Sequence, residues 1–140
     1  MNYKLFENFL PKEAIEIRYK VFTLEQGFAN EDDLDVLDDK SIHIIVFINE
    51  LPIGTARMFK EGEGIYHIGR LAILKEHRGK GIGSFILGVF ENKARELGAK
   101  KMHLGSQIDK AAFYEKNGYK KYGDIFDDAG YPHIMMEKIL

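Results

Sequence analysis

The most informative absence in this sequence is cysteine, which does not occur among its 140 residues. Without a thiol the chain can form no disulfide bond and no thiolate zinc site, and it offers no cysteine nucleophile. A group transfer carried out by this chain cannot pass through a cysteine-bound intermediate, so direct transfer between two bound molecules is the simpler expectation. We expect no bound metal.

Long apolar runs and an excess of basic charge are missing as well. No stretch approaches the roughly 18 apolar residues that span a bilayer, and Met1–Lys4 lacks the charged-then-apolar pattern of a signal peptide. The formal net charge of −2 and the pI near 6.2 give no basic footprint for nucleic acid. We therefore expect a cytoplasmic protein with no membrane and no nucleic-acid partner.

Linker-like composition is also lacking. The chain has only three prolines, no Ser- or Gln-rich segment and no internal repeat. A chain of this length can bury a two-layer core without disulfides or metals. We therefore expect one domain that spans residues 1–140.

What is present is organised around Arg78–Ser84, where three glycines alternate with other residues that include two cations. An apolar strand pattern over residues 65–74 precedes this segment, and an apolar helix pattern over residues 82–97 follows it. The glycines therefore lie at a helix N-terminus, where free N–H groups and aligned peptide dipoles favour an anion. Glycine lets a ligand approach the backbone, and Arg78 and Lys80 add full charges. The pattern predicts a phosphate-binding loop; the alternative is a tight turn without a ligand.

Two common phosphate-binding motifs do not fit this segment. A P-loop requires a glycine where the chain has Leu74, and a Ser or Thr where Gly81 follows Lys80. A dinucleotide fingerprint requires a third glycine at a position occupied here by Ser84 or Ile86. The phosphate-bearing ligand must therefore be of another kind.

The remaining hydrophobic patterns predict a mixed α/β fold with an antiparallel meander in its first half. The strand after the glycine-rich helix must run parallel to the strand before it, so these two neighbours could splay apart. We expect strands over residues 2–7, 41–48, 55–60, 65–74, 101–107, 119–122 and 133–139, and helices over residues 12–25, 82–97 and 109–117, the last capped by Asp109.

The first predicted helix has two faces that differ in character. Its core stripe consists of Ala14, Ile17, Val21 and Leu24. A second face, which carries Arg18, Phe22, Glu25 and Gln26, is either a solvated surface or one wall of a cleft. The acidic run that follows over residues 31–39 is either a solvated loop or a surface that attracts a protonated amine.

The glycine segment and a second motif carry a resemblance to a known family. The pattern Arg78-x-x-Gly81-x-Gly83 after an apolar strand resembles the acyl-CoA pyrophosphate loop of the GNAT superfamily of N-acetyltransferases. The segment Ala112–Tyr119 looks like the family's Phe-Tyr-x-x-x-Gly-Phe motif, and the order of elements is similar along nearly the whole chain. Arg18–Phe22, the acidic run, His43 and Tyr131–His133 look like the small ElaA-type branch of the family.

The resemblance implies a fold, a reaction and a donor. The fold is a GNAT-like α/β fold, with a mostly antiparallel central sheet, one splayed parallel strand pair and helices on both faces. The implied reaction is acetyl transfer from acetyl-CoA to an amine acceptor, which could be a small molecule or a peptide. The acidic run would favour cationic acceptors. A CoA-binding or nucleotide-binding sensor without turnover is the alternative, and a homodimer is left open.

The resemblance also assigns roles to individual residues. Tyr114 looks like the general acid that protonates the departing sulfur, because a phenol stays protonated at neutral pH. The base is left open among His67, Glu25, His133 and water. The residues expected to bind acetyl-CoA are Leu71, Ala72, Ile73, Arg78, Gly79, Lys80, Gly81, Ile82, Gly83, Ser84, Gln107 and Phe113. Those expected on the acceptor side are Arg18, Phe22, Glu25, His67 and His133.

Overall fold

The computed structural model describes the backbone of residues 1–140 and every side chain except those at positions 31 and 32. The strands are β1 (Asn2–Glu7), β2 (Ile42–Ile48), β3 (Leu51–Gly62), β4 (Ile65–Ile73), β5 (Lys101–Gln107), β6 (Lys120–Asp128) and β7 (Tyr131–Ile139). The α-helices are α1 (Lys12–Arg18), α2 (Asn30–Asp33), α3 (Ile82–Glu96) and α4 (Ala111–Lys116). A π-helix, η1 (Tyr19–Glu25), continues α1, and short 3-10 segments are η2 (Val36–Lys40), η3 (Lys75–His77) and η4 (Ile108–Lys110).

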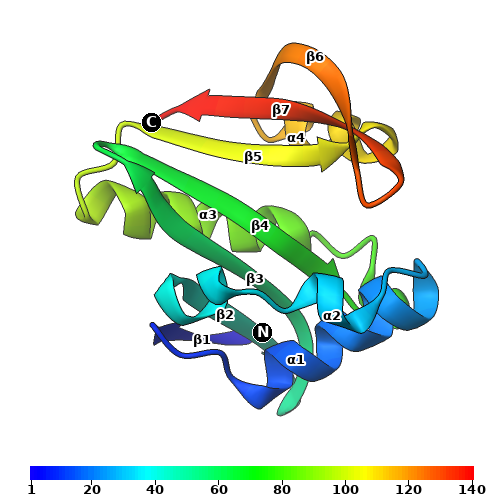
Figure 1. Ribbon diagram of the computed structural model, residues 1–140. Coiled ribbons are helices and arrows are strands. Elements are labelled where there is room, and N and C mark those ends of the chain that lie inside the picture. Colours follow the sequence, from blue (N-terminus) through cyan, green and yellow to red (C-terminus); the bar gives the residue numbers. More distant parts are fainter.

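The strands form one sheet in the order β1-β2-β3-β4-β5-β7-β6. Every neighbouring pair is antiparallel except β4 and β5, which are parallel. That exception follows from connectivity, because α3 crosses over the sheet between them. Helix α3 covers one face, while α1 and the segments after it cover the other (Figure 1). The predicted mixed sheet with helices on both faces is confirmed.

The main core lies between the sheet and α3, and a second, smaller core lies on the opposite face. Residues at helical spacing on α3 are fully buried against the strands, namely Ile82, Ile86, Phe90 and Ala94. Leu97, the last residue of the expected apolar helix pattern, is 45% exposed because α3 ends at Glu96 and Gly98 turns the chain at φ +88°. On the other face, Ile17 and Val21 pack with Ala72 of β4.

The helix expected over residues 12–25 is α-helical only to Arg18 and then widens into a π-helix. The Gln26 N–H donates to the Val21 carbonyl, five residues earlier, at 3.1 Å. A wider turn rotates each later side chain away from its α-helical position. Leu24, expected in the core, is therefore 64% exposed. The same rotation turns the end of η1 toward β5 and the glycine loop.

The predicted divergence of the parallel pair is present and begins at two glycines. β4 and β5 pair only from Ile65 with Lys101 to Ile68 with Leu104. The next residues, Gly69 and Gly105, mark the point from which the strands separate. The second half of β4 therefore has β3 on one side and, in the described structure, no strand partner on the other.

Two predictions about the C-terminal third are wrong in detail. Asp109 does not cap the helix, because it lies within η4 and the N-cap of α4 is Lys110, which makes no side-chain cap. The last two strands are longer than expected and meet in a two-residue turn at Ala129 and Gly130, both at positive φ.

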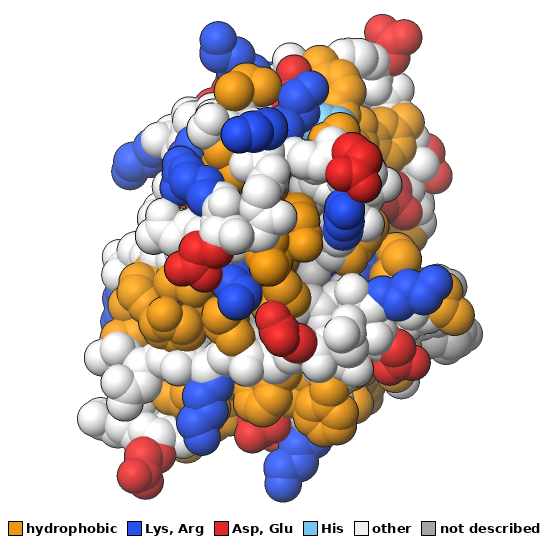
Figure 2. Space-filling view, turned by 90° about the vertical axis from the view of Figure 1, so that its left-hand side faces the viewer, with side chains coloured by type: hydrophobic (Ala, Val, Ile, Leu, Met, Phe, Trp, Pro, Cys, Tyr) orange, Lys and Arg blue, Asp and Glu red, His pale blue; other side chains and the backbone are white. Residues whose placement is uncertain are grey.

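The surface carries charges of both signs. On the face drawn in Figure 2, acidic and basic side chains are interspersed among apolar ones, as the small net charge suggests. In the part of the chain that the structure describes, no helix combines the length and the apolar character needed to cross a bilayer.

Candidate active site

A cavity of about 370 Å³ lies where β4 and β5 diverge. Its walls come from the second half of β4, the end of β5, the residues after η1, helix α4 and the β6–β7 hairpin. A cavity of this size with both apolar and polar walls is typical of a small-molecule site. The separated strands add unpaired backbone groups along one edge, which a ligand can bind as a strand would.

The glycine loop opens α3 with the backbone shape that the sequence suggested, and it is linked to the cavity wall through Phe113, the residue before Tyr114. Gly79 and Gly81 both have φ +77°, a conformation that other residues adopt only under strain, and Gly81 is the N-cap of α3. No side chain caps this N-terminus. The N–H groups of Ile82, Gly83 and the next residue are therefore positioned for an anion.

The third glycine of the loop has a different structural role. A Cβ atom on Gly83 would lie 2.8 Å from the Phe113 ring. Gly83 is thus required for the packing of α4 against α3, because the Phe113 ring of α4 lies directly against it. Ile82 and Ala72 have buried side chains, so they can offer a ligand only backbone groups. Lys80 and Ser84 are exposed at the loop surface.

Arg78 does not present a free charge to the loop. Its two terminal nitrogens lie 2.6 and 2.7 Å from the Glu25 carboxylate, and its Nε donates to the Ile73 carbonyl at 2.9 Å. The bidentate pair joins the loop to the end of η1. The hydrogen bond from Arg78 also lowers the pKa of Glu25, which makes that carboxylate a poor proton acceptor.

A bulge interrupts β4 at the edge of the cavity. Thr55 pairs with Ala72 and Arg57 with Gly69, so Arg70 and Leu71 together oppose a single residue of β3. Arg70 has φ +55°, which is unusual for a residue with a side chain. Arg70 directly follows Gly69, the glycine within the strand expected over residues 65–74. Strain of this kind is concentrated at functional sites.

Tyr114 lines the cavity, and in the described structure its hydroxyl makes no hydrogen bond. Burial raises the pKa of the phenol above its usual value. The neighbouring Tyr119 differs, because its hydroxyl donates to Glu91 at 2.8 Å inside the core. Tyr114 is thus the protonated donor that is available to a ligand, whereas Tyr119 is structural.

Gln107 closes the cavity from the β5 side. Its Nε2 donates to the Gln26 Oε1 at 3.0 Å, and the Tyr131 hydroxyl donates to the Gln26 carbonyl at 2.7 Å. The Phe28 and Tyr131 rings lie 4.8 Å apart. These contacts join the end of η1 to the C-terminal hairpin across the diverging strands.

Two histidines line the cavity, His67 from β4 and His133 from β7. His67 stacks on Phe59 with ring centroids 5.1 Å apart, and burial lowers the pKa of its imidazole. His133 is buried, with its Nδ1 2.9 Å from the Tyr131 carbonyl. Phe22, from the predicted acceptor-side face of the first helix, also lines the cavity.

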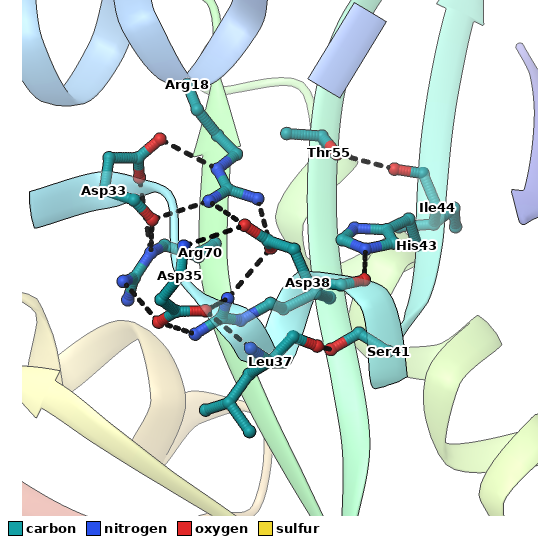
Figure 3. Close-up of polar contacts among 11 residues, drawn as sticks. Arg18, Asp33, Asp35, Leu37, Asp38, Ser41, His43, Ile44, Thr55 and Arg70 are labelled. Atoms are coloured by element: carbon teal, nitrogen blue, oxygen red, sulfur yellow. Dashed lines mark hydrogen bonds and ion pairs between the residues drawn. The ribbon is translucent and has the colours of Figure 1, made fainter. Parts of the chain in front are cut away.

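Arg18 and the acidic run form a buried network, shown in Figure 3. Arg18 is 1% exposed and donates to the carboxylates of Asp33 at 3.0 Å and Asp38 at 2.8 and 3.1 Å. Arg57 donates to Asp35 and Asp38, and Arg70 pairs with Asp33 and Asp35. We call these three arginines and three aspartates the Arg–Asp network.

The network corrects two predictions. Arg18 lies neither on a solvated surface nor in the cavity wall, because a guanidinium buried to this extent must be matched by carboxylates. Asp33 and Asp38 are those carboxylates, and Asp35 pairs with Arg57 and Arg70, so these three aspartates form no free acidic surface that would attract a cationic acceptor. The prediction also covered positions 31 and 32, whose side chains lie outside the described structure.

Several cavity residues were not predicted from the sequence. They include Arg57, Phe59, Phe126 and Met135, whereas Gln26 lines the cavity as one of the two alternatives for its helix face predicted. Arg57 had a usable signal, because a charged residue within an apolar strand is usually paired. The others are ordinary strand or loop residues, and only the register of distant strands brings them to one site.

Comparison with known proteins identifies the family. The acetyltransferase (GNAT) domain family matches residues 14–140. An uncharacterized N-acetyltransferase of Bacillus subtilis (strain 168), YjcF, is 37% identical over 129 residues, which cover 91% of each chain. Protein ElaA of Escherichia coli (strain K12) is 27% identical over 128 residues, which cover 89% of this chain and 84% of ElaA.

Solved structures agree on the fold. The crystal structure of Escherichia coli ElaA superimposes with a TM-score of 0.84 at 23% identity, covering 98% of both chains. A GNAT acetyltransferase from Elizabethkingia anophelis, solved with acetyl-CoA bound, gives a TM-score of 0.74 at 17% identity and covers 99% of this chain and 97% of that one. Acetyl-CoA is the acetyl donor of this family. Both the sequence matches and the fold lead to one conclusion: the chain belongs to the GNAT family of acetyltransferases.

Proposed function

We propose that this protein transfers an acetyl group from acetyl-CoA to an amine acceptor by direct attack, with both molecules bound together. One juxtaposition carries the proposal. The unpaired edge of β4 and Tyr114 with its free hydroxyl line one cavity, and the N-terminus of α3 packs against Phe113, the residue before Tyr114. These are the groups that an acyl-CoA thioester requires for its phosphates, its amide chain and its leaving sulfur.

The donor would be held largely by backbone. Its pyrophosphate would accept hydrogen bonds from the N–H groups that begin α3, with Lys80 as the nearby exposed cation. Its amide-containing arm would pair with the edge of β4 at Leu71, Ala72 and Ile73. One N–H of this bulged edge would donate to the thioester carbonyl, where negative charge develops during the reaction.

The bond changes are simple to balance. The amine nitrogen attacks the carbonyl carbon, a C–N bond forms and the C–S bond breaks. Tyr114 donates its proton to the departing sulfur, and the amine loses one proton to a base. The raised pKa of Tyr114 keeps the phenol protonated at neutral pH, so that it can donate a hydrogen bond and then its proton to the departing sulfur. A proton from solvent then restores the phenol.

The geometry favours one base among those left open by the sequence. Glu25 is occupied by Arg78 and does not line the cavity. His67 lines the cavity, and its lowered pKa keeps the imidazole neutral at pH 7, as a proton acceptor must be. We therefore assign the base role to His67. The acceptor's body would lie against the apolar walls formed by Phe22, Phe59 and Phe126.

The decisive experiment replaces the proposed acid. Tyr114→Phe removes one oxygen atom and should lower kcat for thiol release by about 10²-fold or more, with acetyl-CoA affinity unchanged. Tyr3→Phe is the matched control, because it removes the same hydroxyl group from a tyrosine on β1, far from the cavity. Thiol release from acetyl-CoA with a panel of primary amines measures kcat, and calorimetry measures affinity. Stabilisation by acetyl-CoA without thiol release from the unmodified protein would instead favour a sensor.

The donor site has its own test. Gly81→Val should reduce CoA affinity about tenfold or more, because a β-branched residue at φ +77° distorts the N-terminus of α3. Gly88→Val is the control, since Gly88 lies within the same helix and a Cβ there meets nothing within 4 Å. Unchanged CoA affinity in a folded Gly81→Val protein would refute the phosphate assignment.

A further inference from the structure

A carboxylate lies between two imidazoles on the sheet face that forms the cavity. Glu61 of β3 has one oxygen 2.8 Å from Nδ1 of His103 and the other 3.3 Å from Nδ1 of His67. The other ring nitrogen of His103, Nε2, lies 3.4 Å from a carboxylate oxygen of Glu137 on β7. Adjacent strands set this row, because His67 is in register with His103, and His103 with Glu137.

The row leads from the cavity to the surface. The His67 side chain lines the cavity and is 23% exposed, while that of Glu61 is 37% exposed. The Nδ1 of His67 is buried and has no well-aligned hydrogen bond in the described structure, with the Glu61 oxygen as its adjacent acceptor. A slight rotation of either side chain would align the two groups. The row therefore joins a buried cavity wall to solvent through groups that exchange protons.

The reaction needs such a route. An alkyl ammonium must lose a proton before its nitrogen can attack, and a donor and acceptor that fill a cavity of this size leave little room for bulk water. The proton must then leave through the wall. Resting on the proposed function, we infer that His67, Glu61 and His103 form a proton relay that carries the acceptor's proton from the cavity to solvent.

The transfer involves protons alone and balances at each step. The ammonium N–H bond breaks as Nε2 of His67 takes the proton, and Nδ1 of His67 releases its own proton to Glu61. Glu61 then passes this proton to solvent directly or to His103, and His67 returns to its starting form after the ring rotates or exchanges tautomer. Other charged groups near the row are Arg57 beside His67 and, around His103, Glu137 with its partner Lys101. The Tyr122 ring lies 5.6 Å from that of His103.

The first test measures turnover against pH. Glu61→Gln and His67→Asn should each lower kcat/KM at pH 7 by about tenfold or more with the amine that the unmodified protein acetylates fastest. Loss of His67 should also abolish the acidic limb of the pH profile, and added imidazole should restore part of the activity of His67→Ala. Glu63→Gln is the matched control, because Glu63 lies on the same hairpin but is 97% exposed.

Further measurements distinguish failure of the proposed acetyl transfer from failure of the proton relay. If the unmodified protein releases no thiol with any amine, the proposed function fails and the relay fails with it. If it turns over normally but Glu61→Gln retains full activity and an unchanged pH profile, only the relay is overturned. Independently of turnover, proton NMR titration should show that Glu61→Gln lowers the pKa of His67, because the variant removes a charge that favours the protonated imidazole. An unchanged value would overturn the relay.

Discussion

The Arg–Asp network and the proton relay lie on the same face of the sheet, on either side of the Phe59 ring. They differ in how their charges respond to pH. The Arg–Asp network contains only groups that stay charged near neutral pH, and its three positive charges match its three negative ones. The proton relay contains two imidazoles, which can gain and lose protons. At the centre of the network Arg18, Arg57 and Asp38 are buried, and Asp35 and Arg70 at its edge are partly exposed. Every member of the relay is partly exposed.

The difference separates a structural use of charge from a chemical one. A fully buried guanidinium such as Arg18 is tolerated only when its partners are fixed around it, so the network pins the segment of residues 33–38 onto β3 and β4. A group that must gain and lose protons needs contact with water, as Glu61 has. We can test this comparison by breaking each cluster in turn.

The largest effect is expected from breaking the network. Asp38→Asn leaves Arg18 and Arg57 buried beside a neutral group and should lower the free energy of unfolding by about 3–5 kcal/mol. Asp39→Asn, at the adjacent exposed position, should change it by less than about 0.5 kcal/mol. Urea denaturation followed by circular dichroism compares the two. Equal stabilities would show that the network contributes nothing.

This prediction replaces the expectation that the acidic run selects a cationic acceptor. If Asp35 and Asp38 formed a free acidic surface, neutralising them would raise KM for a cationic amine and spare the fold. The observed pairing predicts loss of the fold first.

An intermediate effect should appear on acidification. Burial opposes ionisation of Asp38, but hydrogen bonds and charges from Arg18 and Arg57 outweigh it and lower its pKa to about 2. A carboxyl group with a lowered pKa contributes stability above its unfolded value near 4 and loses it as pH falls toward 2. The loss should amount to about 2 kcal/mol and should be absent in Asp38→Asn.

The histidines should act in a different pH window. Burial lowers the pKa values of His67 and His43, so protonation favours the unfolded chain, and stability should decline modestly as pH falls below about 6.5. His67→Asn should remove part of that decline and leave the part due to His43. Melting temperatures measured between pH 8 and 5 test this; an identical slope in the variant would contradict it.

The smallest effect on stability is expected from Glu61→Gln. Because Glu61 is partly exposed, its ion pairs should contribute no more than about 1 kcal/mol to the free energy of unfolding. The same variant should nevertheless lower kcat/KM by about tenfold. A large loss of stability would mean that this cluster is structural like the network, and the contrast between the two would disappear.

Local patterns account for much of the fold. Apolar periodicity placed the strands, α3 and the parallel pair, because side chains at those positions must be buried wherever the chain goes. Periodicity failed at Leu24, since a pattern that assumes 3.6 residues per turn cannot anticipate a π-helix. It also failed at Asp109, where a 3-10 turn displaced the helix start by two residues.

The candidate site divides in the same way. The glycine loop could be identified from the sequence because its function depends on consecutive backbone conformations, which Gly79 and Gly81 determine on their own. The arginines and aspartates of the network lie 15 to 37 positions apart, and Glu61 of the relay meets His103, 42 positions away, so nothing local indicates which of these charges meet.

By itself, therefore, the sequence determined the order of elements, the open pair of strands and the anion-binding turn, all of which follow from the conformational preferences of neighbouring residues. The tertiary structure alone decided that Arg18 is buried, that Arg78 is held by Glu25, and that Glu61 lies between two histidines. The reason is physical: strand register and the rotation of the π-helix bring distant side chains within a few ångströms, and ionic interactions depend on that distance.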